Sequence, residues 1–136
     1  MIVDTSALFA IYAEEPGQDE LIDAIFEGCG FIPAPVLVEF QRVTSRDDGS
    51  PDPDADLILR RIIERGFRIE AFTNADAVAA VAANEQFGTG NGRGGKLNLL
   101  DLMVYGMAQR MGLPILCTGK DFSSTDAAIH PASRTG

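Results

Sequence analysis

The chain begins with a short apolar strand that runs directly into a carboxylate. Ile2 and Val3 are apolar and β-branched, Asp4 follows at once, and an apolar helical stretch comes next. This order places the carboxylate of Asp4 at the carboxyl end of a strand, which is where open α/β sheets bind ligands. Asp4 alone leaves two interpretations open, because Asp and Ser, here Asp4 and Ser6, also commonly cap the helix that follows.

Short apolar strands alternate with amphipathic helices along the rest of the chain. The apolar spacing predicts strands at residues 31–32, 67–71 and 115–117, and helices over 7–13, 18–27, 36–44, 57–65, 74–86 and 99–111. This alternation favours an α/β fold in which a mostly parallel sheet carries helices on both faces. The length of 136 residues, with no linker or internal repeat, predicts a single domain over 1–136.

The charge balance restricts the kinds of partner. A formal net charge of −9 argues against non-specific nucleic-acid binding, which depends on Lys and Arg. It remains compatible with an enzyme that meets phosphates through divalent metal ions held by carboxylates, and with a basic protein partner. No apolar run approaches the ~20 residues of a membrane span. Cys29 and Cys117 lie far apart in the sequence, so we expect reduced, buried thiols in a cytoplasmic protein.

Four acidic residues stand in apolar surroundings or directly after a strand: Asp4, Glu39, Asp101 and Asp121. A buried charge is costly unless it is paired or bound to a metal. Converging carboxylates would repel one another, and a hard divalent cation such as Mg²⁺ or Mn²⁺ would relieve that repulsion. Such a cluster is suited to the attack of metal-activated water on a phosphodiester.

Each of these positions also has a purely structural interpretation. Asn98 and Asp101 have the spacing of a helix capping box. Glu39 has Arg42 three residues further on as a possible ion-pair partner. Asp121 can be a turn residue, and Asp126 is a spare acid that can support a metal site or cap a turn.

Several competing motifs fail in detail. The run Gly90–Lys96 satisfies the beginning of a phosphate-binding loop, but Leu97 follows where Ser or Thr is required. We therefore expect a mobile loop whose Arg93 and Lys96 contact substrate phosphates or acidic groups of a partner. The acidic run 52–56 lacks the glycine and the final glutamate of a calcium loop. A haloacid-dehalogenase-type phosphatase would need Asp at the position of Ser6.

The ordered motifs resemble a PIN domain, and specifically the VapC toxins of type II toxin–antitoxin pairs. The matching segments are Ile2-Val3-Asp4-Thr5-Ser6-Ala7, Pro35-Val36-Leu37-Val38-Glu39-Phe40, Leu97-Asn98-Leu99-Leu100-Asp101-Leu102 and Gly119-Lys120-Asp121-Phe122-Ser123-Ser124-Thr125-Asp126. The resemblance implies a Rossmann-like three-layer fold and a Mg²⁺- or Mn²⁺-dependent endoribonuclease that acts on structured RNA such as tRNA. It also implies a homodimer held inactive by a VapB-like antitoxin with a basic C-terminal segment.

The resemblance also assigns roles to residues. Asp4 and Asp101 would be the main metal ligands, Glu39 would bind metal or orient the attacking water, and Asp121 would complete the acidic cluster. Ser6 and Thr5 would hydrogen-bond a carboxylate or water near Asp4.

The chain departs from the family pattern at Leu100, where the family often has glycine before the third acid. This bulkier residue would alter the entry into the helix or crowd the cleft. It keeps open a second hypothesis, a non-catalytic PIN-like module whose acidic cleft only binds a protein partner.

Overall fold

A four-stranded parallel sheet forms the centre of the protein in a computed structural model that describes residues 1–136. The strands lie in the order β3-β2-β1-β4, and every neighbouring pair is parallel. Ile2 pairs with Phe31 on one side and with Ile115 on the other. The strands are β1 (Ile2–Val3), β2 (Phe31–Pro33), β3 (Arg68–Glu70) and β4 (Ile115–Leu116).

Six α-helices and one 3₁₀ helix connect and extend the strands. They are α1 (Thr5–Tyr12), α2 (Gln18–Glu27), α3 (Ala34–Thr44), α4 (Pro53–Glu64), α5 (Asn74–Phe87), α6 (Leu99–Met111) and the 3₁₀ helix η1 (Phe122–Ser124). None of them combines the length and the apolar character that crossing a membrane requires.

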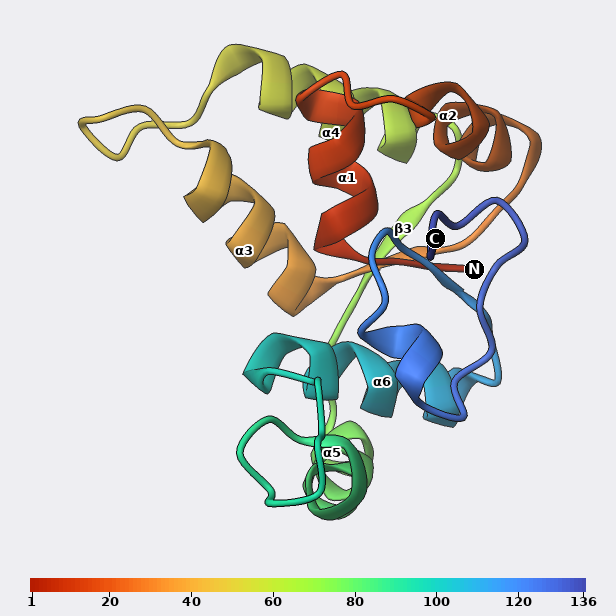
Figure 1. The fold of residues 1–136 in the computed structure, drawn as a ribbon. Coiled ribbons are helices and arrows are strands. Elements are labelled where there is room, and N and C mark those ends of the chain that lie inside the picture. Colours follow the sequence, from red (N-terminus) through yellow and green to blue (C-terminus); the bar gives the residue numbers. More distant parts are fainter.

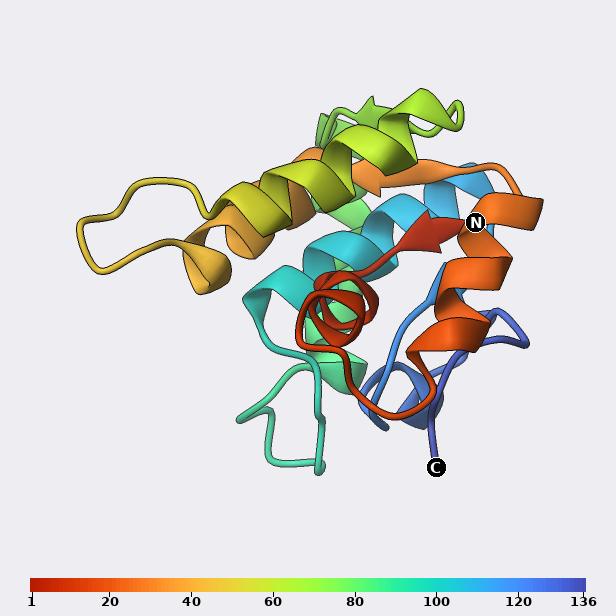
Figure 2. The same ribbon diagram turned by 90° about the horizontal axis from the view of Figure 1, so that it is seen from above.

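The helices cover both faces of the sheet. In Figure 1, α1, α2 and α4 lie on one side of the strands, while α5 and α6 lie on the other. The helix α3 leaves the carboxyl edge of the sheet and contacts α1, α4 and α6. Viewed from above in Figure 2, α3 and α4 run beside each other, and the loop between them projects from the body. The predicted Rossmann-like three-layer fold with helices on both faces is confirmed.

The central strands are fully buried, as expected for a parallel sheet with helices on both faces. Ile2, Val3, Ile32, Ile115 and Leu116 each expose 0% of their surface. Because these residues are packed from both sides, the carboxyl ends of β1, β2 and β4 are held at one edge. The residues that follow these strands therefore start from fixed positions.

Two local predictions were wrong in their details. The helix expected from residue 57 begins at Pro53, because Asp52 caps it by accepting from the backbone N–H of Asp54 (2.9 Å). Cys117 is buried as predicted, but Cys29 is exposed.

Candidate active site

Asp4 lies at the end of β1 and is only 5% exposed. Its Oδ2 accepts hydrogen bonds from the backbone N–H of Ser6 (3.0 Å) and from the Ser6 hydroxyl (2.5 Å), so that it caps α1. The Ser6 Oγ in turn accepts from the backbone N–H of Thr118, just beyond β4 (3.0 Å). Ser6 therefore ties the Asp4 carboxylate to the carboxyl ends of two neighbouring strands.

Asp101 lies in the first turn of α6 and is 9% exposed. The backbone N–H of Asn98 donates to Asp101 Oδ2 (3.0 Å), while Asn98 Oδ1 accepts from the backbone N–H of Asp101 (2.9 Å). This is the capping box that the sequence predicted. It fixes the carboxylate at the N-terminus of the helix and leaves it free to face the other acids.

The predicted acids influence one another electrostatically. Burial is the main reason that the pKa of Asp101 is raised to about 7, and the charges of Asp4, Asp121 and Glu39 raise it further. The hydrogen bond from the Asn98 backbone acts in the opposite direction and lowers this pKa. Burial also raises the pKa of Asp4, with a further contribution from Glu39 that opposes the hydrogen bonds from Ser6. The charges of Asp4, Glu39 and Asp121 therefore all act on the Asp101 carboxylate, as expected for acids that face the same edge of the sheet.

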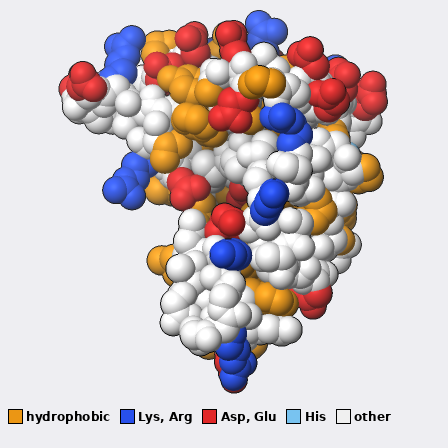
Figure 3. Space-filling view, viewed as in Figure 1, with side chains coloured by type: hydrophobic (Ala, Val, Ile, Leu, Met, Phe, Trp, Pro, Cys, Tyr) orange, Lys and Arg blue, Asp and Glu red, His pale blue; other side chains and the backbone are white.

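Glu39 and Asp121 form the outer part of this cluster. Glu39 is half-buried on α3, and no ion pair with Arg42 forms. Asp121 is exposed directly before η1, whose Phe122 is buried and holds the turn against the core. Figure 3 shows acidic side chains around the recess between the upper helices and the α5–α6 layer. We call Asp4, Glu39, Asp101 and Asp121 the acidic quartet.

The structure resolves what Leu100 does. The helix α6 begins normally at Leu99 with its capping box intact, so the entry into the helix is unaltered. Leu100 packs against the core and lines a shallow pocket together with Glu39, Asn98, Leu99 and Met103. It therefore forms an apolar border next to the acidic quartet.

Thr5 differs from Ser6 in its bonding. Thr5 is 7% exposed, and its Oγ1 is buried without a hydrogen-bond partner. A buried hydroxyl usually has a partner, so this atom next to Asp4 is available to a water or another ligand of the site.

Three further predicted residues lie apart from these contacts. Arg93 is exposed on the loop between α5 and α6, 4.0 Å from Glu85, and Lys96 is exposed on the same loop. Asp126 accepts a hydrogen bond from the Tyr105 hydroxyl (2.6 Å). None of the three is in hydrogen-bond contact with the acidic quartet.

The donor set suits a hard divalent cation. Its ligands are carboxylate oxygens, the preferred donors of Mg²⁺ and Mn²⁺. No Lys or Arg forms an ion pair with any member of the quartet. No three of the His, Cys, Asp and Glu side chains converge tightly enough to enclose a metal ion. Mg²⁺ does not require such an enclosing group, because it is usually bound through one or two carboxylates and keeps several waters. Asp4 and Asp101 are the two buried carboxylates of this set.

A third buried acid, besides Asp4 and Asp101, was not predicted. Asp76 on α5 is 0% exposed and accepts hydrogen bonds from Arg110 Nε (2.5 Å) and from the backbone N–H of Thr73 (2.7 Å). Burial alone would raise the pKa of Asp76, but these bonds outweigh it and lower that pKa. The spacing Thr73-x-x-Asp76, a capping box, was the sequence signal that could have revealed it.

Comparisons with known proteins agree with this geometry. The family model of the PIN domain matches residues 1–128. The VapC ribonuclease Mb2780c of Mycobacterium bovis and the ribonuclease VapC42 of Mycobacterium tuberculosis are each 36% identical over 134 residues, covering 97% of this chain and 98% of the relative. The ribonuclease VapC36 of Mycobacterium tuberculosis is 35% identical over 129 residues, covering 93% of this chain and 90% of that protein.

A solved structure has the same fold. One chain of a toxin–antitoxin complex from Klebsiella pneumoniae superposes with a TM-score of 0.64 at 18% identity, covering 96% of both chains. The family match over nearly the whole chain and the identity to full-length relatives lead to one conclusion. The chain belongs to the PIN-domain family, and within it to the VapC group.

Proposed function

We propose that the protein is a divalent-metal-dependent endoribonuclease and the toxin of a type II toxin–antitoxin pair. The observation that carries this proposal is the pair of buried, mutually repelling carboxylates, Asp4 and Asp101, at the carboxyl edge of the sheet. The names of the relatives as VapC ribonucleases support it. We further propose structured RNA such as tRNA as the substrate.

Each side chain of the site has a distinct task in this proposal. Asp4 and Asp101 hold Mg²⁺ or Mn²⁺, and Ser6 and Asn98 orient these two carboxylates through the bonds described above. Glu39 orients the attacking water and accepts its proton, as a carboxylate on the cleft wall can. Asp121 adds negative charge at the open side of the cluster. The bound cation, when present, activates water and stabilises the charge on the departing oxygen.

The same charge distribution supports an antitoxin partner. The acidic quartet lacks ion pairs within the chain, and the protein carries a net charge of −9. A VapB-like antitoxin with a basic C-terminal segment would neutralise these carboxylates and occupy the place of the metal. Such complementarity favours fast and specific association.

We also propose a homodimer. The side chains of Val38, Val78, Val81 and Leu99 are between 64% and 77% exposed on α3, α5 and α6. Of these, Val81 and Leu99 line one apolar pocket together with Met103, and exposed apolar patches favour association. Sedimentation of the purified protein would test this part of the proposal: a monomer at all concentrations contradicts it.

Cleavage of a total tRNA pool by antitoxin-free protein tests the activity. The reaction is run with Mg²⁺ or Mn²⁺ and with EDTA, and with Asp4→Asn and Asp101→Asn variants whose circular dichroism matches that of the wild type. The exposed Asp54→Asn on α4 serves as the matched control.

We expect discrete fragments that need the metal, that are lost in both site variants and that persist in the control. Absence of cleavage by the wild type, or cleavage that survives both site substitutions, would contradict the proposal. Metal binding without any cleavage would instead favour the non-catalytic protein-binding module.

A further inference from the structure

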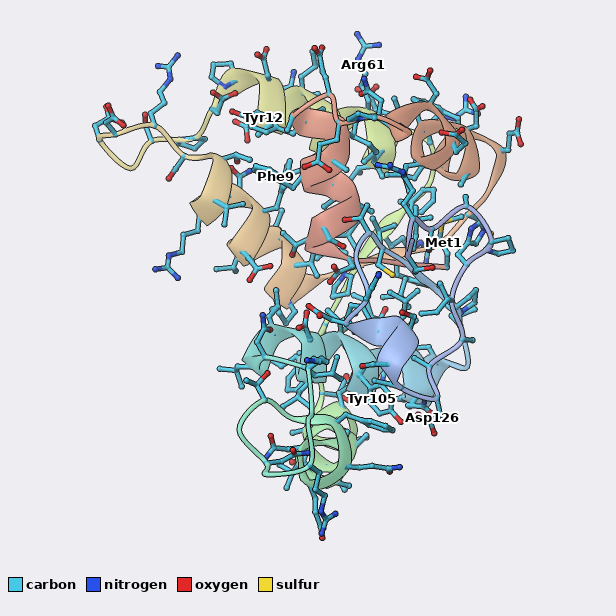
Figure 4. The ribbon with its side chains drawn as sticks, viewed as in Figure 1. Met1, Phe9, Tyr12, Arg61, Tyr105 and Asp126 are labelled. Atoms are coloured by element: carbon cyan, nitrogen blue, oxygen red, sulfur yellow. The ribbon has the colours of Figure 1, made fainter.

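Tyr105 and Asp126 join two segments that carry members of the acidic quartet. Tyr105 lies on α6, one turn after Asp101, so the two residues share a face of the helix. Its hydroxyl donates to Asp126 Oδ1 across a 2.6 Å hydrogen bond that spans 21 residues of sequence. Figure 4 shows the two side chains directed toward each other from α6 and from the segment after η1.

The tyrosine is held firmly in this position. Tyr105 is 7% exposed, and its ring packs against Phe87 of α5 at a centroid distance of 5.7 Å. Burial, together with the bond to Asp126, raises the pKa of Tyr105 to about 12, so the hydroxyl remains a donor at all physiological pH values. The ring thus presents a fixed donor to the segment opposite.

The segment that carries Asp126 is a compact turn of its own. The Asp121 carbonyl accepts from the Ser124 hydroxyl (2.5 Å), and the Phe122 carbonyl accepts from the Thr125 hydroxyl (2.6 Å). The Thr125 hydroxyl oxygen also accepts from the backbone N–H of Ala127 (3.0 Å). Asp121 and Asp126 therefore lie at the two ends of one internally bonded turn, so that fixing one end constrains the other.

We propose that Tyr105 and Asp126 are a positioning pair that sets the placement of Asp121 relative to Asp101. The bond clamps the turn against the helix that carries Asp101, while buried Phe122 holds its middle. Asp126 then acts through Tyr105 and is not itself a metal ligand. This inference rests on the proposed function, because it assumes that the acidic quartet binds the metal.

Mn²⁺ binding measured by electron paramagnetic resonance tests the pair without RNA. Tyr105→Phe removes only the hydroxyl, Asp126→Ala removes the acceptor, and Asp126→Asn retains an acceptor oxygen. Tyr12→Phe, which removes the hydroxyl of a half-buried tyrosine on α1, is the matched control. The metal dependence of tRNA cleavage is measured in parallel.

We expect Tyr105→Phe and Asp126→Ala each to raise the Mn²⁺ dissociation constant about threefold to tenfold, the scale of one lost hydrogen bond. The double variant should be no worse than either single variant, because both break the same bond. Asp126→Asn and Tyr12→Phe should bind like the wild type. The maximal cleavage rate at saturating Mn²⁺ should recover in Tyr105→Phe.

Three results would overturn the positioning role. The first is unchanged Mn²⁺ binding in Tyr105→Phe, and the second is additive effects in the double variant. The third is Mn²⁺ binding as weak in Asp126→Asn as in Asp126→Ala, because that result would mean that the charge of Asp126 binds the metal directly. A wild type that binds Mn²⁺ but cleaves no RNA refutes only the proposed function. A wild type that binds no Mn²⁺ refutes the metal site and the positioning role together.

Discussion

Replacing Asp101 with Asn should make the metal-free protein more stable. The Asp101 carboxylate is buried beside Asp4, Glu39 and Asp121, and its pKa is raised to about 7 from 3.8. The folded state therefore holds a proton that the unfolded chain releases. Asn removes the charge and keeps an oxygen that can accept the hydrogen bond from the Asn98 backbone, so the capping box survives.

The size of the effect follows from that pKa. One pKa unit corresponds to about 1.4 kcal/mol, so the full difference would be about 4 kcal/mol. This is an upper bound, because the cleft is open to water and solvent screens the carboxylates. We expect a gain of about 2 kcal/mol in the free energy of unfolding at pH 8, which raises the Tm of a domain of this size by about 7 °C.

The gain should depend on pH with a defined sign. For a carboxyl group whose folded pKa is raised, stability falls as the pH rises from about 4 to about 7, and it is constant above that range. The advantage of Asp101→Asn should thus be absent at pH 4 and complete above pH 7. Adding Mn²⁺ should stabilise the wild type but not Asp101→Asn, and should therefore reduce the difference between their free energies of unfolding.

Thermal melts in EDTA from pH 4 to pH 8 test this reasoning. The exposed Asp54→Asn, which also removes one negative charge, should change stability by less than about 0.5 kcal/mol at every pH. A variant less stable than the wild type at pH 8, or a gain that does not change with pH, would refute the account of the site electrostatics.

Three other substitutions give further predictions. Asp76→Asn should lower the free energy of unfolding by about 2 kcal/mol in chemical denaturation at pH 7, because Arg110 loses its buried partner. Since the pKa of Asp76 is lowered in the folded protein, this difference between variant and wild type should vanish as the pH falls below 3.8. Ser6→Ala should reduce RNA cleavage about 10- to 100-fold by releasing Asp4, and an unchanged rate would contradict the bond to Asp4. Gly106→Ala should cost about 1–3 kcal/mol in the same denaturation assay, because its Cβ would lie 2.5 Å from the Asp76 carbonyl oxygen and force α5 and α6 apart.

The parts of the site that depend on local sequence could be predicted. The strand that ends at Asp4 and the capping box of Asn98 and Asp101 each occupy a few consecutive residues, and the structure contains both. The order of strands and helices indicated which edge of the sheet would collect the acids. The apolar spacing predicted the start of α3 to within two residues.

Contacts between distant residues could not be predicted in this way. Thr73 and Asn74 are both good capping residues, and Thr73 is the one that caps α5. The Asp76 carboxylate, which accepts from the backbone N–H of Thr73, also accepts from Arg110, 34 residues further along the chain. Asp126 looked like a spare acid because its partner, Tyr105, lies on a different element. Local patterns carry no information about such pairings.

Parallel titration of metal binding and RNA cleavage tests the central claim most directly. Mn²⁺ is added to the wild type, Asp4→Asn and Asp101→Asn, and bound Mn²⁺ and tRNA cleavage are measured in the same samples. We predict that cleavage by the wild type rises along its binding curve, and that both variants lose binding and cleavage together. Cleavage in EDTA, or cleavage that does not follow Mn²⁺ occupancy, would contradict a metal-dependent nuclease built on these carboxylates.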